Sequence, residues 1–376
     1  MAIVNLTIDG RKIQAQAGST ILEVAEANGI HIPVLCHHPA LPPEGACRVC
    51  LVDIERQRNL QPACTYPASE GLVVDTATPR VVEARKFALE LIISDHPLDC
   101  MTCEATGDCR LQDLAYEYDV KGDKFPGSQR HQYRVDDPNP FIQVDRNKCI
   151  LCRRCVRACT YINGVEAISV IQRGFSARVG FGMDSTMQDS PCEFCGSCVE
   201  VCPTAALWPK LSIGKGRPWQ LKQFETVCSY CGVGCKLNLH VRDNQIVKVT
   251  GAQGAANHSF TCVKGRFGYD YVNHPDRLSK PLVRRYLLEG KPKPASHATR
   301  GGSGHAPDPD AEFVETTWEQ ALSLVTEKWA DIKHRHGGDA FAALASARCT
   351  NEENYLVQKL ARQVLETHNV DHCARL

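Results

Sequence analysis

Cysteine spacing constrains this 376-residue chain more than any other feature of its sequence. Nineteen of its 21 cysteines fall, together with one histidine, into five short groups. In chain order the groups are Cys36, Cys47, Cys50, Cys64; His96, Cys100, Cys103, Cys109; Cys149, Cys152, Cys155, Cys159; Cys192, Cys195, Cys198, Cys202; and Cys228, Cys231, Cys235, Cys262. Convergence of four cysteine thiolates is the usual way in which a protein holds an iron–sulfur cluster. The spacing therefore predicts several such clusters and an electron-transfer function.

Length and composition are consistent with several domains in a reducing compartment. The start of the chain lacks the basic and apolar regions of a signal peptide, and no run approaches the roughly 20 apolar residues that cross a bilayer. We therefore expect a cytoplasmic protein without a transmembrane segment, in which close-set cysteines favour metal over disulfides. The 43 basic residues balance 43 acidic ones, which gives no electrostatic reason to expect nucleic acid as a partner.

Local signals predict the secondary structure around the first two groups. Asp9-Gly10 separates two alternating runs and predicts a hairpin, and Thr20 with Glu23 predicts a capping box. Thr78-Pro79 predicts the start of a helix that ends at His96-Pro97. The expected strands are 2–8, 11–16, 49–54 and 71–76, the expected short helix is 21–28, and the expected apolar face of the longer helix is Val81, Ala84, Ala88, Leu91 and Ile92.

The first two groups predict different clusters. The spacing C-x10-C-x2-C-x13-C among strands favours a two-iron cluster in a β-grasp ferredoxin, with structural zinc as the alternative. In the second group, H-x3-C-x2-C-x5-C, three cysteines lack a fourth cysteine partner. We therefore predict that His96 completes a His/Cys3 four-iron site, the alternative being a histidine that only caps or packs against its helix.

The third and fourth groups repeat the spacing C-x2-C-x2-C-x3-C, and the second copy ends in Pro203. This is the bacterial ferredoxin pattern, in which the fourth cysteine of each run serves the other cluster. We therefore pair Cys202 with the first three cysteines of the first run, and Cys159 with those of the second. Three arginines, Arg153, Arg154 and Arg157, lie among these ligands. A solvated basic face is the expected interpretation, and the alternatives are that they offset the charge of the clusters or face a partner.

The fifth group and the region after it differ from the ferredoxin runs. The spacing C-x2-C-x3-C-x26-C predicts another four-iron cluster, with structural zinc as the alternative, and Cys349 and Cys373 are left over. Residues 289–310 are rich in polar, glycine and proline residues and are expected to form a flexible insertion. Beyond it we expect a helix from Thr317 to Gly337, a short buried strand at 340–346 and a helix capped by Asn351, as at the start of an α/β domain.

The order of these groups resembles the catalytic alpha subunit of molybdenum- or tungsten-dependent formate dehydrogenases, which are molybdopterin oxidoreductases. The resemblance covers the whole chain and is strongest at Val227-Cys228-Ser229-Tyr230-Cys231-Gly232, at Cys262-Val263-Lys264-Gly265, and in the tail from Asn351 to Leu376. It implies a multidomain α+β fold. The implied domains are a β-grasp two-iron ferredoxin at 1–78, a His/Cys3 four-iron domain at 79–120, a double four-iron ferredoxin domain at 138–212, a four-iron molybdopterin-oxidoreductase domain at 220–276, and the incomplete start of an α/β pterin-binding domain at 277–376.

The resemblance also implies the chemistry of the full-length enzyme. Formate would be oxidised at molybdenum or tungsten held by two pterin guanine dinucleotides, and Lys264 would relay electrons between the last cluster and a pterin. A flavin- and NAD-binding diaphorase-type subunit would accept the electrons. In the resembled family the metal-ligating cysteine or selenocysteine directly follows a Cys-Ala-Arg-hydrophobic segment, so we expect it after Leu376. A UGA codon there is one explanation of the endpoint, and a gene fragment is another.

Other functions share part of this pattern. A large iron–sulfur subunit of NADH dehydrogenase would have the first two groups and the last, but normally one cluster where this chain has the doubled run. An iron-only hydrogenase would have the first four groups but different motifs after residue 212. A non-catalytic electron-transfer module is the remaining alternative, because the chain as given lacks the expected metal ligand.

Overall fold

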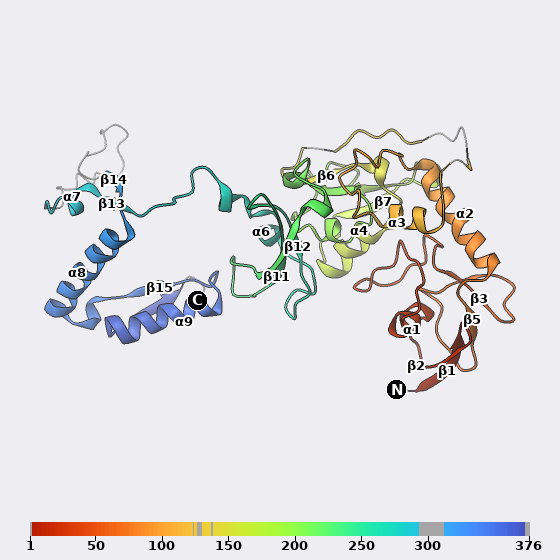
Figure 1. Cartoon of the computed structure of the whole chain (residues 1–376), viewed down its shortest axis with the longest axis horizontal. Coiled ribbons are helices and arrows are strands. Elements are labelled where there is room, and N and C mark those ends of the chain that lie inside the picture. The colour runs from red at the N-terminus through yellow and green to blue at the C-terminus, as the bar shows by residue number, and fades with distance from the viewer. Residues whose placement is uncertain (1, 123, 126–129, 137, 293–311, 373–376) are drawn as a thin grey trace. The chain divides into compact units, whose positions relative to one another are not determined.

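The computed structural model forms two compact units (Figure 1). The first unit comprises Met1–Val227 and Cys235–Tyr269, and the second comprises Cys228–Gly234 and Asp270–Leu376. The residues that the structure describes are 2–122, 124–125, 130–136, 138–292 and 312–372. Within these ranges, no helix is both long and apolar enough to cross a membrane.

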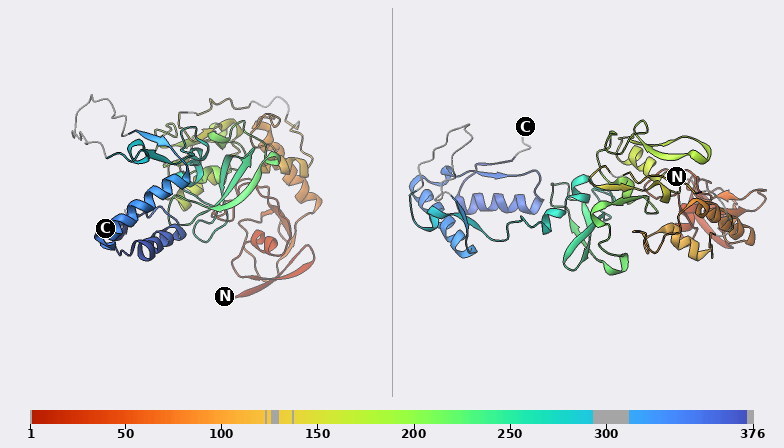
Figure 2. Two further views of the ribbon diagram at one scale, coloured as in Figure 1. Left: turned by 60° about the vertical axis from the view of Figure 1, so that its left-hand side comes forward. Right: turned by 90° about the horizontal axis from the view of Figure 1, so that it is seen from above.

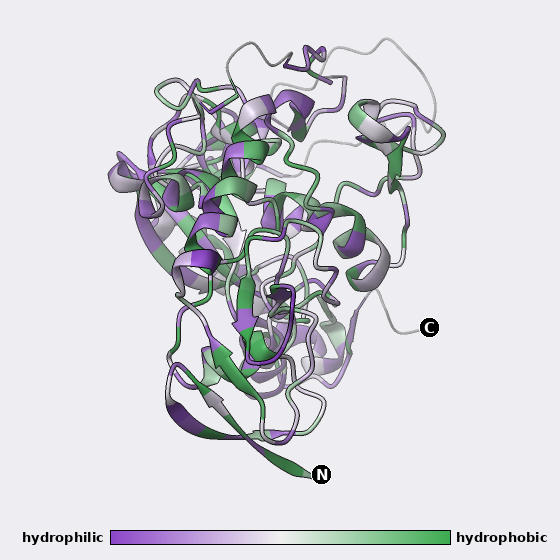
Figure 3. Ribbon diagram, turned by 90° about the vertical axis from the view of Figure 1, so that its right-hand side faces the viewer, coloured by the Kyte–Doolittle hydropathy of each residue, from purple (hydrophilic) through white to green (hydrophobic). Residues whose placement is uncertain are grey.

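A five-stranded sheet opens the first unit. Its strands are β1 (Ile3–Ile8), β2 (Arg11–Gln16), β3 (Leu51–Ile54), β4 (Gln61–Pro62) and β5 (Val73–Asp75), in the order β2-β1-β5-β3-β4. β1 and β5 are parallel, whereas the other neighbouring strands are antiparallel. The predicted hairpin is confirmed, and both turn residues, Asp9 and Gly10, have positive φ as a tight hairpin turn requires. Charged residues on the edge strand β2 contrast with the mostly apolar β1 (Figure 3).

Helix α1 (Ile21–Ala27) packs against this sheet (Figures 1 and 2). Its capping box forms as predicted, because Thr20 accepts from the Glu23 amide and the Glu23 carboxylate accepts from the Thr20 amide. The helix buries Ile21, Leu22 and neighbouring apolar residues among those of the strands. These apolar contacts stabilise the sheet, and the loops of the first cysteine group connect its elements.

Helix α2 (Pro79–Asp95) begins at Thr78 and ends at His96, as predicted, but its buried face matches the expected one only in part, at Val81 and Ile92. The buried stripe is Val81, Arg85, Leu89 and Ile93, with Glu90 beside it, whereas Leu91 is 49% exposed. Arg85 is buried because its Nε and Nη2 donate to the Leu51 carbonyl at 3.0 and 2.7 Å, and Nη1 donates to the Tyr118 hydroxyl at 3.1 Å. A charged residue thus occupies a core position that an apolar pattern excludes.

Replacing Arg85 by alanine is expected to lower the free energy of unfolding of this region by about 2–4 kcal/mol, because buried packing and charge-assisted hydrogen bonds are lost together. Urea unfolding followed by circular dichroism measures the change. Arg80→Ala is the matched control, since Arg80 lies on the same helix with about half of its side chain exposed, and its loss should cost about 1 kcal/mol or less. Equal effects of the two substitutions would contradict this account.

Short elements separated by ligand loops make up the rest of the first unit. They are α3 (Arg110–Glu117), β6 (Ile142–Val144), α4 (Arg154–Arg157), β7 (Ile168–Ile171), β8 (Arg178–Phe181), α5 (Ser197–Glu200), β9 (Leu207–Pro209), β10 (Lys222–Val227), β11 (Lys236–Arg242), β12 (Gln245–Gly251) and α6 (Val263–Phe267). Strands β6 and β9 pair, β7 pairs with β8, and β10-β11-β12 form an antiparallel sheet. Several predicted ligand cysteines lie within the apolar core around Phe181 and Met187.

The second unit contains β13 (Leu282–Arg284), α7 (Arg285–Leu288), β14 (Phe313–Glu315), α8 (Trp318–His336), β15 (Ala343–Ala345), α9 (Asn351–Leu360) and β16 (Val370–His372). Helix α8 has the predicted limits, with Thr317 as its N-cap. Strand β15 lies alongside α9 and pairs in parallel with β16, which confirms the expected strand–helix–strand order (Figures 1 and 2).

Three expectations for the second unit need correction or remain open. The N-cap of α9 is Thr350, not Asn351, and it forms a capping box with Glu353. The predicted strand at 340–346 is shorter and is not buried, since Leu344 is 84% exposed and its sheet has only two strands among the described residues. Most of the expected insertion at 289–310 lies outside the described residues.

Candidate iron–sulfur sites

The first cysteine group comes together beside the N-terminal sheet. Cys36, Cys50 and Cys64 are buried, and Cys47 is half-buried. Hydrogen bonds with Cys47 and Cys64 lower the pKa of the Cys36 thiol, and hydrogen bonds with Cys36 and Cys50 raise the pKa of the Cys64 thiol. The Cys47 amide donates to the Cys36 sulfur at 3.4 Å. Four sulfur donors with an amide directed at one of them fit an iron–sulfur cluster, whose potential depends on such bonds.

The second group surrounds a cavity between α2 and α3. His96, Cys100 and Cys109 line this cavity together with apolar residues such as Ile93 and Leu111. Cys103 is buried and close enough to interact electrostatically with Cys100 and Cys109. The Nδ1 atom of His96 is buried and has no hydrogen-bond partner among the described residues. Burial lowers the pKa of His96 and so favours the neutral imidazole, the form that binds metals.

The third and fourth groups interact across the two runs. One cavity is lined by Cys149, Cys152, Cys155 and Cys202, so the last cysteine of the second run faces the first three of the first run. Burial raises the pKa of Cys149 to about 11 and of Cys152 to about 12, and Cys202 contributes in the same direction. A cluster that replaces these thiol protons with iron would remove that penalty for holding thiolates in an apolar site.

The remaining four cysteines of the doubled run form a matching set. Burial raises the pKa of Cys198, and the charges of Cys195, Cys192 and Cys159 raise it further. Cys159 in turn interacts with Cys195, which belongs to the other run. The arrangement is that of the predicted exchange of fourth ligands, and the ligand roles themselves stay predictions.

The fifth group is divided between the two units. Cys228 and Cys231 belong to the second unit, whereas Cys235 and Cys262 belong to the first. Its four-iron cluster therefore stays a prediction. Lys264 lies in α6 with an exposed side chain, and its proposed relay role also stays a prediction.

The expectation of a solvated basic face is wrong for Arg154 and Arg157 and holds only for the exposed Arg153. Arg157 is buried and Arg154 half-buried, and both donate to backbone carbonyls of the first cysteine group's loop. The exposed Arg153 forms an ion pair with Glu44 at 2.5 Å. Arg154 and Arg157 therefore fasten the loop of the first cysteine group to the ferredoxin runs.

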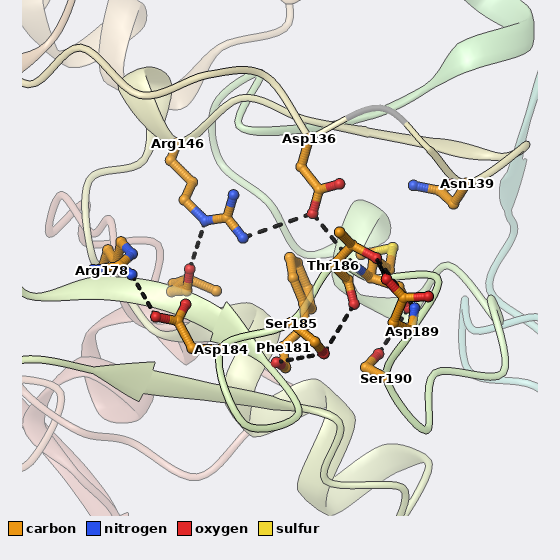
Figure 4. Close-up of polar contacts among 12 residues, drawn as sticks. Asp136, Asn139, Arg146, Arg178, Phe181, Asp184, Ser185, Thr186, Asp189 and Ser190 are labelled. Atoms are coloured by element: carbon orange, nitrogen blue, oxygen red, sulfur yellow. Dashed lines mark hydrogen bonds and ion pairs between the residues drawn. The ribbon is translucent and has the colours of Figure 1, made fainter.

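Other charged residues near the sites were not identified from the sequence. Arg146 lines the cavity of the third group, and its Nε donates to the Val179 carbonyl at 2.8 Å. Its guanidinium points toward Asp136 at 3.7 Å (Figure 4). Arg266 is 1% exposed and lies 2.5 Å from the Glu200 carboxylate, as an ion pair without hydrogen-bond geometry. No sequence signal marked Arg146 and Arg266 as charged residues near a site. Their partners Val179 and Glu200 lie more than 30 positions away along the chain, and only Asp136 is nearer.

Within the described ranges, no three His, Cys, Asp or Glu side chains are arranged to hold a single metal ion. This finding concerns mononuclear sites. The four ligands of a cluster are divided among its iron atoms, one to each iron of a four-iron cluster and two to each iron of a two-iron cluster, so three of them do not converge on one ion.

Five family models match successive segments of the chain. They are a 2Fe-2S iron-sulfur cluster binding domain at 2–79, the NADH-ubiquinone oxidoreductase-G iron-sulfur binding region at 85–123, the ferredoxin-like domain of NADH-quinone oxidoreductase subunit 3 at 139–208, the molybdopterin oxidoreductase Fe4S4 domain at 221–274, and molybdopterin oxidoreductase at 277–376. The chain belongs to the molybdopterin oxidoreductase family, with iron–sulfur domains. Its iron–sulfur domains form an electron-transfer module.

Curated relatives of the chain have several names. The chain is 36% identical over 99% of its length to an NADH-quinone oxidoreductase subunit of Rhizobium meliloti, and 36% identical over its whole length to the alpha subunit of an NADPH-Fe(3+) oxidoreductase of Geobacter sulfurreducens. It is 32% identical over 99% of its length to "Putative formate dehydrogenase YrhE" of Bacillus subtilis. The chain spans about two fifths of the length of each relative, 40% in all three cases.

A solved structure resembles part of the chain. It is a chain of an NAD+-reducing [NiFe]-hydrogenase, which matches with a TM-score of 0.54 and 32% identity. The match covers 57% of this chain and 91% of the hydrogenase chain.

Metal analysis gives a direct check of the ligand groups. One two-iron and four four-iron clusters require about 18 iron atoms per chain. We expect anaerobically purified, fully loaded protein to approach that value and to contain little zinc. The first and fifth groups also match a four-thiolate zinc site. Zinc in the first group would lower the iron content by about two atoms, and zinc in the fifth group would lower it by about four.

Proposed function

We propose that the chain is the iron–sulfur electron-transfer part of a formate dehydrogenase alpha subunit. The observation that carries this proposal is the combination of a doubled ferredoxin run with a following molybdopterin-oxidoreductase Fe4S4 segment. Relatives named as formate dehydrogenases match nearly the whole chain. When bound, the clusters would supply one-electron carriers. The chain's own contribution is to hold them with the cysteines and His96, and to place buried arginines beside them.

The proposed partner is a flavin- and NAD-binding subunit. The similarity to a chain of an NAD+-reducing hydrogenase and to a subunit of NADH-quinone oxidoreductase supports this proposal. The sequence has no Gly-x-Gly-x-x-Gly fingerprint at a strand-to-helix turn, which is consistent with nicotinamide binding elsewhere in a complex. Formate as the substrate, a bis-pterin guanine dinucleotide with molybdenum or tungsten, and the cytoplasmic location belong to the same proposal.

A second candidate function is electron relay from NADH or NADPH without formate chemistry. The two relatives at 36% identity favour it, because their names refer to NADH-quinone and NADPH-Fe(3+) oxidoreductases. The doubled run of cysteines favours the formate interpretation, since a relay subunit of the NADH dehydrogenase type normally has one cluster there.

Activity of the purified complex separates the two candidates. The gene is expressed with its neighbours under anaerobic conditions, with molybdate or tungstate supplied, and the complex is isolated through a tag on this chain. Formate-dependent reduction of viologen and of NAD+ supports the first proposal. NADH- or NADPH-dependent viologen reduction without any formate-dependent activity, in protein with full iron and pterin content, would support the relay and rule out formate as substrate.

A further inference from the structure

Arg157 connects the loops of two predicted cluster sites through one nitrogen atom. Its side chain leaves the end of α4 and is buried, with the residue 7% exposed. The Nη2 atom donates to the carbonyl oxygen of Cys36 and, at 3.2 Å, to that of Cys152. Cys36 is a predicted ligand of the two-iron cluster, and Cys152 is a predicted ligand of the first four-iron cluster. One guanidinium therefore joins the ligand backbones of two sites that lie more than 100 positions apart in sequence.

Two further contacts hold the Arg157 side chain. Nη1 donates to the Pro42 carbonyl at 2.6 Å, and Nε lies 3.3 Å from the Glu44 carboxylate as an ion pair without hydrogen-bond geometry. The planar guanidinium has five N–H donors in fixed directions and stays charged, whereas a lysine ammonium is a single point charge on a flexible stem. The bridge between Cys36 and Cys152 thus requires the shape of arginine as well as its charge.

We propose that Arg157 is a positioning residue that sets the separation and the reduction potentials of the two-iron site and the first four-iron site. The inference rests on the proposed electron-transfer function, but not on formate as the substrate. In the step concerned, one electron leaves the reduced site and enters the oxidised one, and no bond breaks. The rate of such a step falls steeply with distance. The buried positive charge also favours the reduced state of both sites, because it lies in a region of low dielectric constant.

The test uses the complete complex and the variants Arg157→Gln, Arg157→Lys and Arg153→Gln. The third is the matched control, because exposed Arg153 contacts Glu44 and no ligand carbonyl. Iron content and paramagnetic resonance show whether each cluster is present. Redox titration gives the two potentials, and rapid freeze-quench resonance after reduction with dithionite or NADH gives the rate of electron exchange between them. None of these measurements requires formate turnover.

Both clusters should remain in Arg157→Gln, with lower potentials and with electron exchange slowed several-fold, because the rate falls with the separation of the two sites. Arg157→Lys should restore much of the potentials but not the rate, and Arg153→Gln should match the parent protein. Parent-like potentials and exchange in Arg157→Gln would overturn the proposal. If that variant loses a cluster, Arg157→Lys decides. Parent-like exchange there, or loss of the cluster from both variants, also overturns it, because Arg157 would then serve folding alone.

Discussion

Replacing Cys202 by alanine is expected to abolish the four-iron cluster of the first ferredoxin run, although Cys202 belongs to the second run of the sequence. The reason is geometric, since Cys202 lines one cavity with Cys149, Cys152 and Cys155. Loss of one of four thiolates should remove this cluster or convert it to a three-iron form. The Cys192, Cys195, Cys198 and Cys159 site should keep its iron. Iron should fall by up to about four of the roughly 18 atoms per chain.

The reciprocal variant provides the sharpest control. Cys159→Ala should affect the cluster of the second run and spare that of the first, and Cys349→Ala should leave the iron content unchanged. Mössbauer spectra and paramagnetic resonance of the reduced proteins distinguish the two four-iron sites. If Cys202→Ala instead removed the cluster of Cys192, Cys195 and Cys198, each run would hold its own cluster and the exchange of fourth ligands would be refuted.

Local structure was predictable where its cause lies within a few residues. Asp9-Gly10 specifies the hairpin, Thr20 with Glu23 specifies the start of α1, and Thr78 specifies the start of α2. In each case the residues that form the turn or cap are the ones that carry the sequence signal. The shift of the α9 cap from Asn351 to Thr350 shows the limit of this reasoning, because both residue types cap helices and only the backbone decides between them.

Contacts between distant parts of the chain were not predictable. Arg153, Arg154 and Arg157 have partners in the loop of the first cysteine group that lie 109 to 121 positions away, at Glu44, His37, Pro42 and Cys36. A basic cluster in the sequence therefore gave no sign of its burial. The face of α2 was misjudged for the same reason, since Arg85 enters the core only because the Leu51 carbonyl and the Tyr118 hydroxyl accept its hydrogen bonds there. An apolar periodicity cannot represent a buried charge that is satisfied by tertiary hydrogen bonds.

For the candidate sites, too, local features could be predicted from the sequence and contacts between distant residues could not. Ligand spacing within each run is local and identified the cysteines directly. The exchange of fourth ligands followed from a known pattern, and the cavity that unites Cys202 with the first run agrees with it. The surrounding charges, such as Arg146, depend on how loops pack and became visible only in the fold.

Replacing His96 by cysteine is expected to lower the reduction potential of the second cluster by about 100–300 mV. The estimate follows from Rieske centres, where two histidines in place of two cysteines raise the potential by several hundred millivolts. A thiolate adds a negative charge where a neutral imidazole has none, so the reduced state becomes harder to reach. The position of His96 supports this prediction, because its ring lines one cavity with Cys100 and Cys109 and its Nδ1 is buried without a partner among the described residues.

Redox titration followed by paramagnetic resonance measures the shift, and His96→Ala tests whether the side chain is needed at all. With alanine, a cluster that depends on His96 should lose iron or bind an external ligand such as imidazole, and added imidazole should restore its spectrum. His131→Ala is the matched control, because that histidine is engaged by Asp95 at 2.6 Å and stacks on Phe175 and Tyr133. An unchanged potential in His96→Cys with full iron content would show that His96 only caps α2, and the fourth ligand of Cys100, Cys103 and Cys109 would have to come from another residue.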